Sequence, residues 1–489
     1  MDIGDTSQNH VRVSTQIFTA IAASMGAMGA GTILGFSAPA GPQLVPGNTT
    51  ALSNGTSHLT LTPMEYSWVS SIPNLAAAIS SVVAGAAINR LGRRTSMRLL
   101  VLPFVLGWLL VGLADRFSLL LLGRILQGFC VGGVFVAAPT LIGEVTSPHI
   151  RGICGASTPL LAASGMLYVY AIGVLISWRW LALASLPFTI LFGIGTLIFR
   201  ESPVFLLGKR RDKEALEALR WYRGSMYDCD KEIVNIKNNV QFNQSTKSSS
   251  LQELKQPWNR RALIVSLGLM AGQQLCGVNA ILFNANSIFQ LTSTQYCREF
   301  KCNLLFLTKD IVRLDSPTLV ISSLKRMLLM SSSCFMGVAL AGVGAYFYCK
   351  EKDPEYATNS LSWLPLTGLM VFMVAFAVSY GPIPWVMMGE LFSGDVRDLC
   401  SSIAACFNWS LSFIVTLTFV PMQEALGAAW TYWVFGIVCL LSLVFCMFLV
   451  PETKGRTLEE VAVLMGKPQQ QTQLADENSE MDQIKSLLF

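Results

Sequence analysis

Two nine-residue stretches decide the fold of this chain: GEVTSPHIR at residues 143–151 and GELFSGDVR at residues 389–397. Both begin with Gly-Glu, and in both an arginine follows the glutamate by seven residues. The residues concerned are Glu144 with Arg151 and Glu390 with Arg397. Two such matches, separated by about half of the chain, indicate an internal repeat.

A second pair of matching stretches supports this repeat. RESPVFL directly follows an apolar run, at residue 200, and PETKGRT does the same at residue 451, which aligns Glu201 with Glu452. The two glutamate pairs are offset by 246 and 251 residues, so the matches are nearly in register. In a membrane protein, a long shared offset predicts two similar halves of six helices each.

The composition is that of a polytopic membrane protein. Of 489 residues, 52% are hydrophobic and only 13% are charged, whereas a soluble domain carries about 25% charged residues. A single large soluble core would not produce many separate apolar runs, each long enough to cross a bilayer as a helix. The runs lie near residues 16–38, 67–88, 97–114, 118–140, 153–176, 180–199, 262–289, 327–349, 361–388, 399–421 and 430–450.

Basic residues set the expected orientation. NRLGRRTSMR, between the second and third runs, and residues 200–261 are rich in arginine and lysine, so both should face the cytoplasm, as should the N-terminus. The net charge of +5 therefore needs no nucleic acid. The loop at residues 41–64 should lie outside, and its sequons predict glycosylation at Asn48 and Asn54.

The motifs along the chain resemble one known family. GAAINRLGRR, GRILQG, GEVTSPHIRG, RESPVFLL, GQQLCGVNA, GPIPWVMMGELF and PETKGRTLEEV occur in this order. Together they closely resemble the sugar-porter branch of the major facilitator superfamily, and within it the facilitative glucose transporters and trehalose transporters. The resemblance implies an all-α membrane protein of twelve spans, in two six-helix bundles around a central sugar site, with a cytoplasmic helical segment between the halves.

This resemblance divides the chain into five parts. We expect a cytoplasmic N-terminus (1–15), an N-terminal bundle (16–199), a cytoplasmic linker with short helices (200–261), a C-terminal bundle (262–450) and a cytoplasmic tail (451–489).

The seventh run carries polar side chains suited to a sugar. Gln273, Gln274 and Asn279 offer amide donors and acceptors for hydroxyl groups, and such groups in a span usually face the bundle interior. Gln273 and Asn279 do not share one helical face, but Gly277 would let the helix bend or unwind between them. Amides also bond simply from helix to helix, and the residues alone do not separate the two roles.

The resemblance adds further residues to this site. It implies that Phe376 and Trp385, both in the run at residues 361–388 that two prolines interrupt, line the sugar site, together with Asn408 and Trp409 in the run at residues 399–421. The chain departs from the family at Pro159, where a glutamine is common and where trehalose transporters are more similar. It also departs at Phe283-Asn284, where a tyrosine pair often forms an outer gate.

The repeated charges predict a network that joins helix ends on the cytoplasmic side, in one conformation of a rocking transporter. Ordinary interfacial charges that set topology are the alternative. The expected members are Arg93, Arg94, Arg124, Glu144, Arg151, Glu201, Glu390, Arg397 and Glu452.

Transport without coupling to protons is the favoured function. Proton-coupled porters of this family typically carry a buried carboxylate in the first helix, and QIFTAIAASMGAMGAGTILGF has none. A proton-coupled symporter and a non-transporting sugar sensor remain alternatives. No metal-ligand cluster, nucleotide loop or nucleophile with a base is found, so we expect no enzyme, metal or cofactor. The expected partners are a sugar and the lipid bilayer, with one chain working as a monomer in the plasma membrane.

The stretch at residues 291–324 does not fit this plan. Topology requires an eighth span here, but Lys309, Asp310, Arg313 and Asp315 each cost about 2.5–3.5 kcal/mol at the centre of a membrane, and Pro317 interrupts the same window. We therefore expect a foreign segment, from alternative splicing or a mistaken gene model, that replaces the eighth helix and yields a defective form. The alternative is a polar helix shielded by protein.

Overall fold

The computed structural model describes residues 12–45, 59–224, 227, 229–245, 253–283, 324–392, 396–454, 456 and 458–467. Throughout these residues the chain is helical, without strands. Eleven stretches among them are long and apolar enough to cross a membrane, which agrees with the eleven apolar runs of the sequence. The expected foreign segment, apart from Leu324, lies outside the described residues, as do Asn48 and Asn54.

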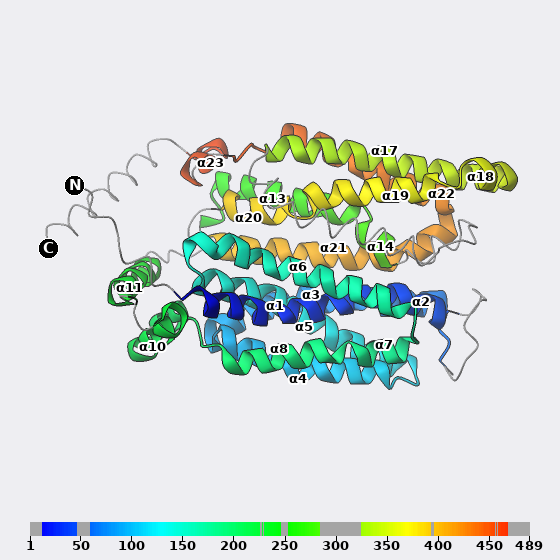
Figure 1. Cartoon of the computed structure of the whole chain (residues 1–489). Helices are drawn as coiled ribbons and strands as arrows, with labels where there is room; N and C mark the ends of the chain where they lie inside the picture. The colour runs from blue at the N-terminus through cyan, green and yellow to red at the C-terminus, as the bar shows by residue number, and fades with distance from the viewer. Residues whose placement is uncertain are drawn as a thin grey trace.

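The N-terminal half contains six spans, which lie together in the lower part of Figure 1. Two of them are interrupted, because α1 gives way to α2 at Phe36 and α7 to α8 at Ser185. The helices are α1 (Val13–Gly35) with α2 (Ser37–Leu44), α3 (Pro63–Leu91), α4 (Arg93–Gly112), α5 (Phe117–Val145), α6 (Pro148–Gly173), and α7 (Trp178–Ala184) with α8 (Leu186–Ile198).

The described part of the C-terminal half supplies five spans, in the upper part of Figure 1. Here too, two spans are interrupted. The helices are α13 (Pro257–Leu275) with α14 (Val278–Phe283), α17 (Lys325–Lys352), α19 (Leu364–Ala375) with the π-helix η2 (Phe376–Tyr380) and α20 (Ile383–Leu391), α21 (Arg397–Leu426) and α22 (Ala428–Phe448). The short α18 (Pro354–Ser360) follows α17.

Local sequence explains where the second span begins and ends. Thr62 accepts a hydrogen bond from the Glu65 backbone, and the Glu65 carboxylate accepts one from the Thr62 backbone, so a capping box starts α3. Gly92 has φ +100° and turns the chain from α3 into α4. A Cβ at Gly92 would stand 2.5 Å from the Glu201 carboxylate, so only glycine lets that side chain approach the turn.

The two halves meet mainly where α21 packs along α3. Asn74 Nδ2 donates to Thr416 Oγ1 at 3.4 Å, and the rings of Trp68 and Phe413 lie 6.0 Å apart. Ala38 on α2 also joins the buried core of the C-terminal half, and α14 contacts both α1 and α2. The halves are therefore in contact at the end of the bundle where α2 and α14 lie.

The linker helices α9 (Pro203–Gly208), α10 (Asp212–Arg223) and α11 (Cys229–Ser245) lie at the other end, on the left in Figure 1. α10 is anchored by its last two residues. Tyr222 Oη donates to the Arg200 carbonyl at 2.6 Å, and its own carbonyl accepts from Gln16. Arg223 donates to the Val145 carbonyl at 2.8 Å and forms an ion pair with Glu232 at 2.7 Å. These contacts fasten the linker to α1, to α5 and to the segment that follows α8.

Candidate functional site

The seventh span is broken at Gly277, between α13 and α14. Gly277 has φ +83°, a backbone conformation that other residues rarely adopt, and an added Cβ would stand 2.7 Å from the Phe435 ring. The break turns Asn279 back toward α13, so that its Nδ2 donates to Gln274 Oε1 at 2.7 Å. Sequence spacing alone would have placed the two side chains on different faces of one helix.

The amides of α13, α14 and α21 form one network with a serine, here called the amide cluster: Gln273, Gln274, Asn279, Asn408 and Ser412. Asn408 donates to Gln273 Oε1 at 2.6 Å and accepts from Gln274 Nε2 at 3.0 Å. Asn279 donates to Ser412 Oγ at 2.8 Å. Gln273, Gln274, Asn408 and Ser412 are all buried. Three of these amides were predicted on α13 and α14 and one on α21, and the structure brings all four together.

The span made of α19, η2 and α20 contributes backbone carbonyls to this cluster. Pro384 has no N–H, so the Tyr380 carbonyl lacks the donor that it would have in a regular helix. Gln273 Nε2 fills this role, donating to the Tyr380 carbonyl at 2.6 Å and to the Gly381 carbonyl at 3.1 Å. The side chain of Tyr380 in turn bonds to Ser333 on α17 at 2.9 Å. The polar cluster is thus built where two broken spans face each other.

The predicted aromatic residues lie in different surroundings. Phe376 is buried in the core of the C-terminal half. Trp385 on α20 is 37% exposed. Trp409 packs against Phe135 of the N-terminal half, with ring centroids 6.0 Å apart. Trp409 therefore takes part in the contact between the halves.

Two polar features were missed by sequence reasoning. Ser412 follows Asn408 by four residues, so helical spacing would have placed it on the same face. In the other half, Ser24 on α1 bonds to Ser157 at 2.8 Å and to Thr158 at 3.1 Å, beside Pro159 on α6. Nothing in the run of small residues on α1 marks Ser24 as different from its neighbours.

The N-terminal charge cluster joins three helix ends. Arg93 Nη2 and Glu144 Oε1 form an ion pair of 2.6 Å. Glu201 Oε1 accepts from the backbone N–H groups of Arg93 at 2.9 Å and Arg94 at 3.1 Å. The Arg94 side chain donates to the Leu197 carbonyl at 2.7 Å. The start of α4 is therefore tied to the ends of α5 and α8.

The C-terminal half repeats this arrangement almost atom for atom. Lys325 Nζ pairs with Glu390 Oε2 at 2.6 Å, as Arg93 pairs with Glu144. Glu452 accepts from the backbone N–H groups of Lys325 at 3.3 Å and Arg326 at 3.1 Å, as Glu201 does from its two partners. Arg326 donates to the Met447 carbonyl. The repeat read from the sequence therefore corresponds to a repeated set of contacts.

Arg124 does not belong to this network, and its expected place at the cytoplasmic side is wrong. It lies twenty residues before Glu144 on α5, about 30 Å away along the helix. Its fully buried side chain donates to the carbonyls of Ile33 and Val69 and to Ser37 Oγ, at 3.0–3.1 Å. Neutral oxygens of α1, α2 and α3 thus hold this charge near the opposite end of the bundle.

The remaining predicted members of the network are only partly placed. Arg151 is exposed and donates to the Thr146 carbonyl at 3.3 Å. Arg397 begins α21, but its side chain lies outside the described residues. Glu144 keeps one buried oxygen without a hydrogen bond among the described residues, next to its pair with Arg93.

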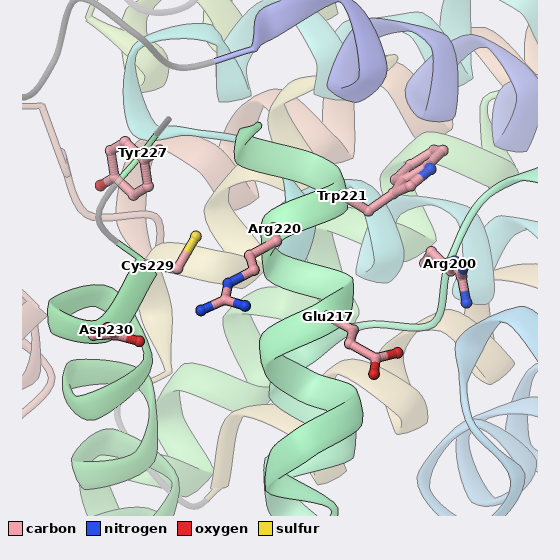
Figure 2. A pocket seen from close by; sticks show the side chains of 7 residues that line it. All are labelled: Arg200, Glu217, Arg220, Trp221, Tyr227, Cys229 and Asp230. Atoms are coloured by element: carbon pink, nitrogen blue, oxygen red, sulfur yellow. The ribbon is translucent and has the colours of Figure 1, made fainter. Parts of the chain in front are cut away.

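A separate pocket of about 470 Å³ lies between α10 and α11, and no residue of the amide cluster lines it (Figure 2). Arginine and acidic side chains line it together with aromatic ones. Burial raises the pKa of the Cys229 thiol and of the Tyr227 hydroxyl, so both are uncharged at neutral pH. The lining residues are Arg200, Glu217, Arg220, Trp221, Tyr227, Cys229 and Asp230.

Comparison with known sequences gives a family. Residues 19–465 match the family model described as "Sugar (and other) transporter". Facilitated trehalose transporter Tret1 of Polypedilum vanderplanki is 32% identical over 480 residues, covering 97% of this chain and 93% of that protein. Tret1 of Bombyx mori is 33% identical and covers 91% and 86%. Tret1 of Aedes aegypti is 31% identical, and this chain spans only 58% of its length. Several such relatives are nearly twice as long as this chain.

Comparison with solved structures gives the fold. An inward-open conformation of the xylose transporter XylE from E. coli superposes with a TM-score of 0.74 at 20% identity, covering 92% of this chain and 99% of that chain. The major facilitator superfamily proton:xylose symporter XylE bound to 6-bromo-6-deoxy-D-glucose gives 0.73 at 20% identity, covering 93% and 100%. The predicted fold class, an all-α membrane protein of the major-facilitator type, is confirmed.

Proposed function

Because this chain belongs to the sugar transporter family, and is a multi-pass membrane protein and not an enzyme, we propose that it carries trehalose across the plasma membrane by facilitated diffusion. A hexose is the second candidate substrate. One chain suffices, with its two halves rocking about a central sugar site.

The amide cluster is the observation that carries this proposal. A sugar presents a ring of hydroxyl groups, each able to donate and accept, and needs neutral partners of the same kind. Gln273, Gln274, Asn279 and Asn408 supply such partners in the membrane interior. Polar side chains are energetically costly there and usually serve a function. We infer that they exchange some of their mutual hydrogen bonds for bonds to the sugar. Trp385, which is partly exposed, supplies the apolar surface on which the sugar ring stacks.

Two features favour trehalose over glucose. The relatives named above are described as trehalose transporters. In the fifth span, Pro159 stands where glucose transporters commonly have a glutamine, and the neighbouring Ser157 and Thr158 hydroxyls bond to Ser24. A site with hydroxyls here, in place of a long amide, leaves more room for a disaccharide.

The absence of a carboxylate supports uniport. The first span, Val13–Leu44, contains no aspartate or glutamate. The fully buried Arg124 is held there by carbonyl and hydroxyl oxygens and by the neutral Gln127. Without a group that gains and loses a proton at this place, coupling lacks its simplest mechanism. Sugar uptake should therefore continue when an uncoupler dissipates the proton gradient. Uptake that collapses at unchanged sugar concentration would establish the symporter instead.

Alternating access is supported by the contacts of the two halves. Ala38 and Tyr170 of the N-terminal half pack into the core of the C-terminal half, whereas Ile153 on α6 is 77% exposed. We propose that this arrangement is closed toward the outside, with the charge clusters of each half free to pair across the halves in the other state.

Counterflow in liposomes tests transport and substrate together. The purified protein is reconstituted with unlabelled sugar inside, and labelled trehalose or glucose is added outside. Transient accumulation of labelled trehalose above that of glucose is the expected result. Equal accumulation would make hexose an equal substrate, and binding without accumulation of either sugar would identify a sensor.

A further inference from the structure

The two halves differ in charge where their backbones correspond. Arg93 and Lys325 occupy equivalent positions, because each pairs with the glutamate of its half and bonds through its N–H to Glu201 or Glu452. Counting from these positions, Arg98 corresponds to Met330, and Arg200, just before Glu201, corresponds to Pro451. The C-terminal half builds the same contacts without these two arginines. Arg98 and Arg200 are therefore not needed for the repeated cluster.

Arg98 is held close to another arginine. Arg98 Nε and Arg94 Nε both donate to the Thr196 carbonyl, each at 3.0 Å, near the end of α8. The negative end of the helix dipole partly offsets the repulsion between the two guanidinium groups. An anion between them would offset it further.

Arg200 is available to a ligand. Its guanidinium group has no hydrogen bond or ion pair with any residue in the described part of the chain, although its carbonyl accepts from Tyr222. In Figure 2 its side chain projects from the segment that follows the sixth span, apart from Arg220 and Asp230 on the linker side.

Arg94, Arg98 and Arg200 line one pocket of about 220 Å³. Arg211 lines it as well, with three glutamates. Two of these glutamates are engaged, since Glu201 accepts from backbone N–H groups and Glu214 pairs with Arg211 at 2.6 Å. Glu217 remains to receive a cationic group. By the same standard Arg94 and Arg211 are engaged, so the pocket offers the guanidinium group of Arg200, the remaining donors of Arg98 and the Glu217 carboxylate at a cytoplasmic helix end.

The pocket continues into an apolar surface of the spans. Thr95 lines it, and Leu99 and Leu102 follow on the same face of α4, 60% and 67% exposed. On α8, Leu197 and Ile198 are 65% and 51% exposed beside the carbonyls that hold Arg94 and Arg98. A ligand in the pocket therefore lies next to side chains that face lipid.

We propose that this pocket binds the headgroup of an acidic phospholipid of the cytoplasmic leaflet. Arg98 and Arg200 hold the phosphate, Glu217 receives the ammonium group of a serine headgroup, and the acyl chains run along Leu99 and Leu102. Basic pockets at the cytoplasmic end of spans are suited to such headgroups. Charges that only set topology would not require a pocket or an adjoining apolar surface.

The test uses the purified full-length protein in detergent. Bound lipid is counted by native mass spectrometry during titration with phosphatidylserine and, separately, phosphatidylcholine. Arg98→Met, which installs the residue of the corresponding C-terminal position, and Arg200→Gln are each compared with Arg456→Gln, an exposed cytoplasmic arginine of the other half. Each of the two pocket variants should weaken phosphatidylserine binding about fivefold, while Arg456→Gln and phosphatidylcholine binding stay unchanged.

A second measurement uses the unaltered protein, so the proposal does not depend on the folding of a variant. Phosphatidylserine should raise the melting temperature, and millimolar O-phosphoserine, the soluble headgroup, should not. If O-phosphoserine stabilised the protein as much as the lipid does, the pocket would be a site for soluble anions. That result would contradict the proposal that it binds a phospholipid. Equal binding of phosphatidylserine and phosphatidylcholine, or equal losses in all three variants, would leave only a general attraction of basic residues to the membrane.

Discussion

Asn408 on α21 bridges two consecutive amides of α13, donating to Gln273 Oε1 at 2.6 Å and accepting from Gln274 Nε2 at 3.0 Å. Each of these amides therefore has a partner before a sugar arrives. At the proposed site, sugar binding would exchange one set of neutral hydrogen bonds for another, so the net gain in free energy per contact would be small. Such a balance suits a transporter, which must also release its substrate.

Replacing Asn408 by alanine should affect both transport and stability. Asn408→Ala leaves Gln273 Oε1 and Gln274 Nε2 without their partner, which costs about 1–3 kcal/mol for each stranded group that stays buried. We expect weaker trehalose counterflow and a lower melting temperature. Ser410→Ala is the control, because within the described part of the chain Ser410 bonds only in its own helix, to the Cys406 carbonyl at 2.8 Å. Normal counterflow by Asn408→Ala at normal surface expression would place the sugar elsewhere.

The effects on sugar affinity and melting temperature should differ among three site variants: Gln273→Ala, Asn279→Ala and Trp385→Ala. The first two remove members of the amide cluster and should lower both sugar affinity and melting temperature. Trp385 is partly exposed, so its loss should lower affinity with little change in melting temperature. Binding by intrinsic fluorescence and thermal unfolding, measured on the same preparations, separate the two effects. Unchanged affinity in all three variants would contradict the proposed site.

The break at Gly277 should tolerate no side chain. Gly277→Ala forces φ +83° on a residue with a Cβ and drives that atom into the Phe435 ring, so α14 must shift and carry Asn279 away from Gln274. The Gly277→Ala variant should lose transport while it is still expressed at the cell surface. Gly389→Ala is the matched control, since an added Cβ there meets no atom within 4 Å. Equal transport by both variants would show that the break does not position the amides.

The Lys325–Glu390 pair should contribute more to stability than an exposed pair. The Lys325 side chain is only 8% exposed and that of Glu390 33%, so Glu390→Gln strands a mostly buried charge. We expect a loss on the order of 1–3 kcal/mol, below the 3–5 kcal/mol of fully buried pairs because water reaches Glu390. Lys325→Met together with Glu390→Gln should recover part of the loss. Glu214→Gln, in an exposed pair with Arg211, should change the melting temperature little.

The hypothesis of a foreign segment at residues 291–324 concerns residues outside the described part, but the chain on its C-terminal side is in register. Lys325 and Arg326 make with Glu452 the backbone contacts that Arg93 and Arg94 make with Glu201. Replacing residues 291–324 by an apolar helix should therefore raise transport and stability. Sequencing of the transcript across codons 285–330 is the direct check. A transcript that encodes this exact peptide, with normal sugar transport by the expressed protein, would refute the hypothesis.

The sequence predicted the repeat because similar charged stretches recur at nearly equal offsets, whereas the contacts of Glu201 and Glu452 with backbone N–H groups are seen only in the structure. The predicted position of Arg124 was wrong because its partners are mostly backbone carbonyls, which cannot be recognised from residue types. The hydrogen bond from Gln273 to the Tyr380 carbonyl could have been predicted from the sequence, since Pro384 lacks the N–H from which this carbonyl would otherwise accept. The break of the helix at Gly277, by contrast, depends on a backbone angle that glycine permits but does not require.

The anchoring of α10 has a mechanical consequence. Tyr222 and Arg223 bond to the N-terminal half at Gln16, Val145 and Arg200. The linker should therefore move together with the N-terminal half if the two halves rock as proposed. A spin label on α10 would then report the tilt of the N-terminal half against a second label on α22, with no probe near the sugar.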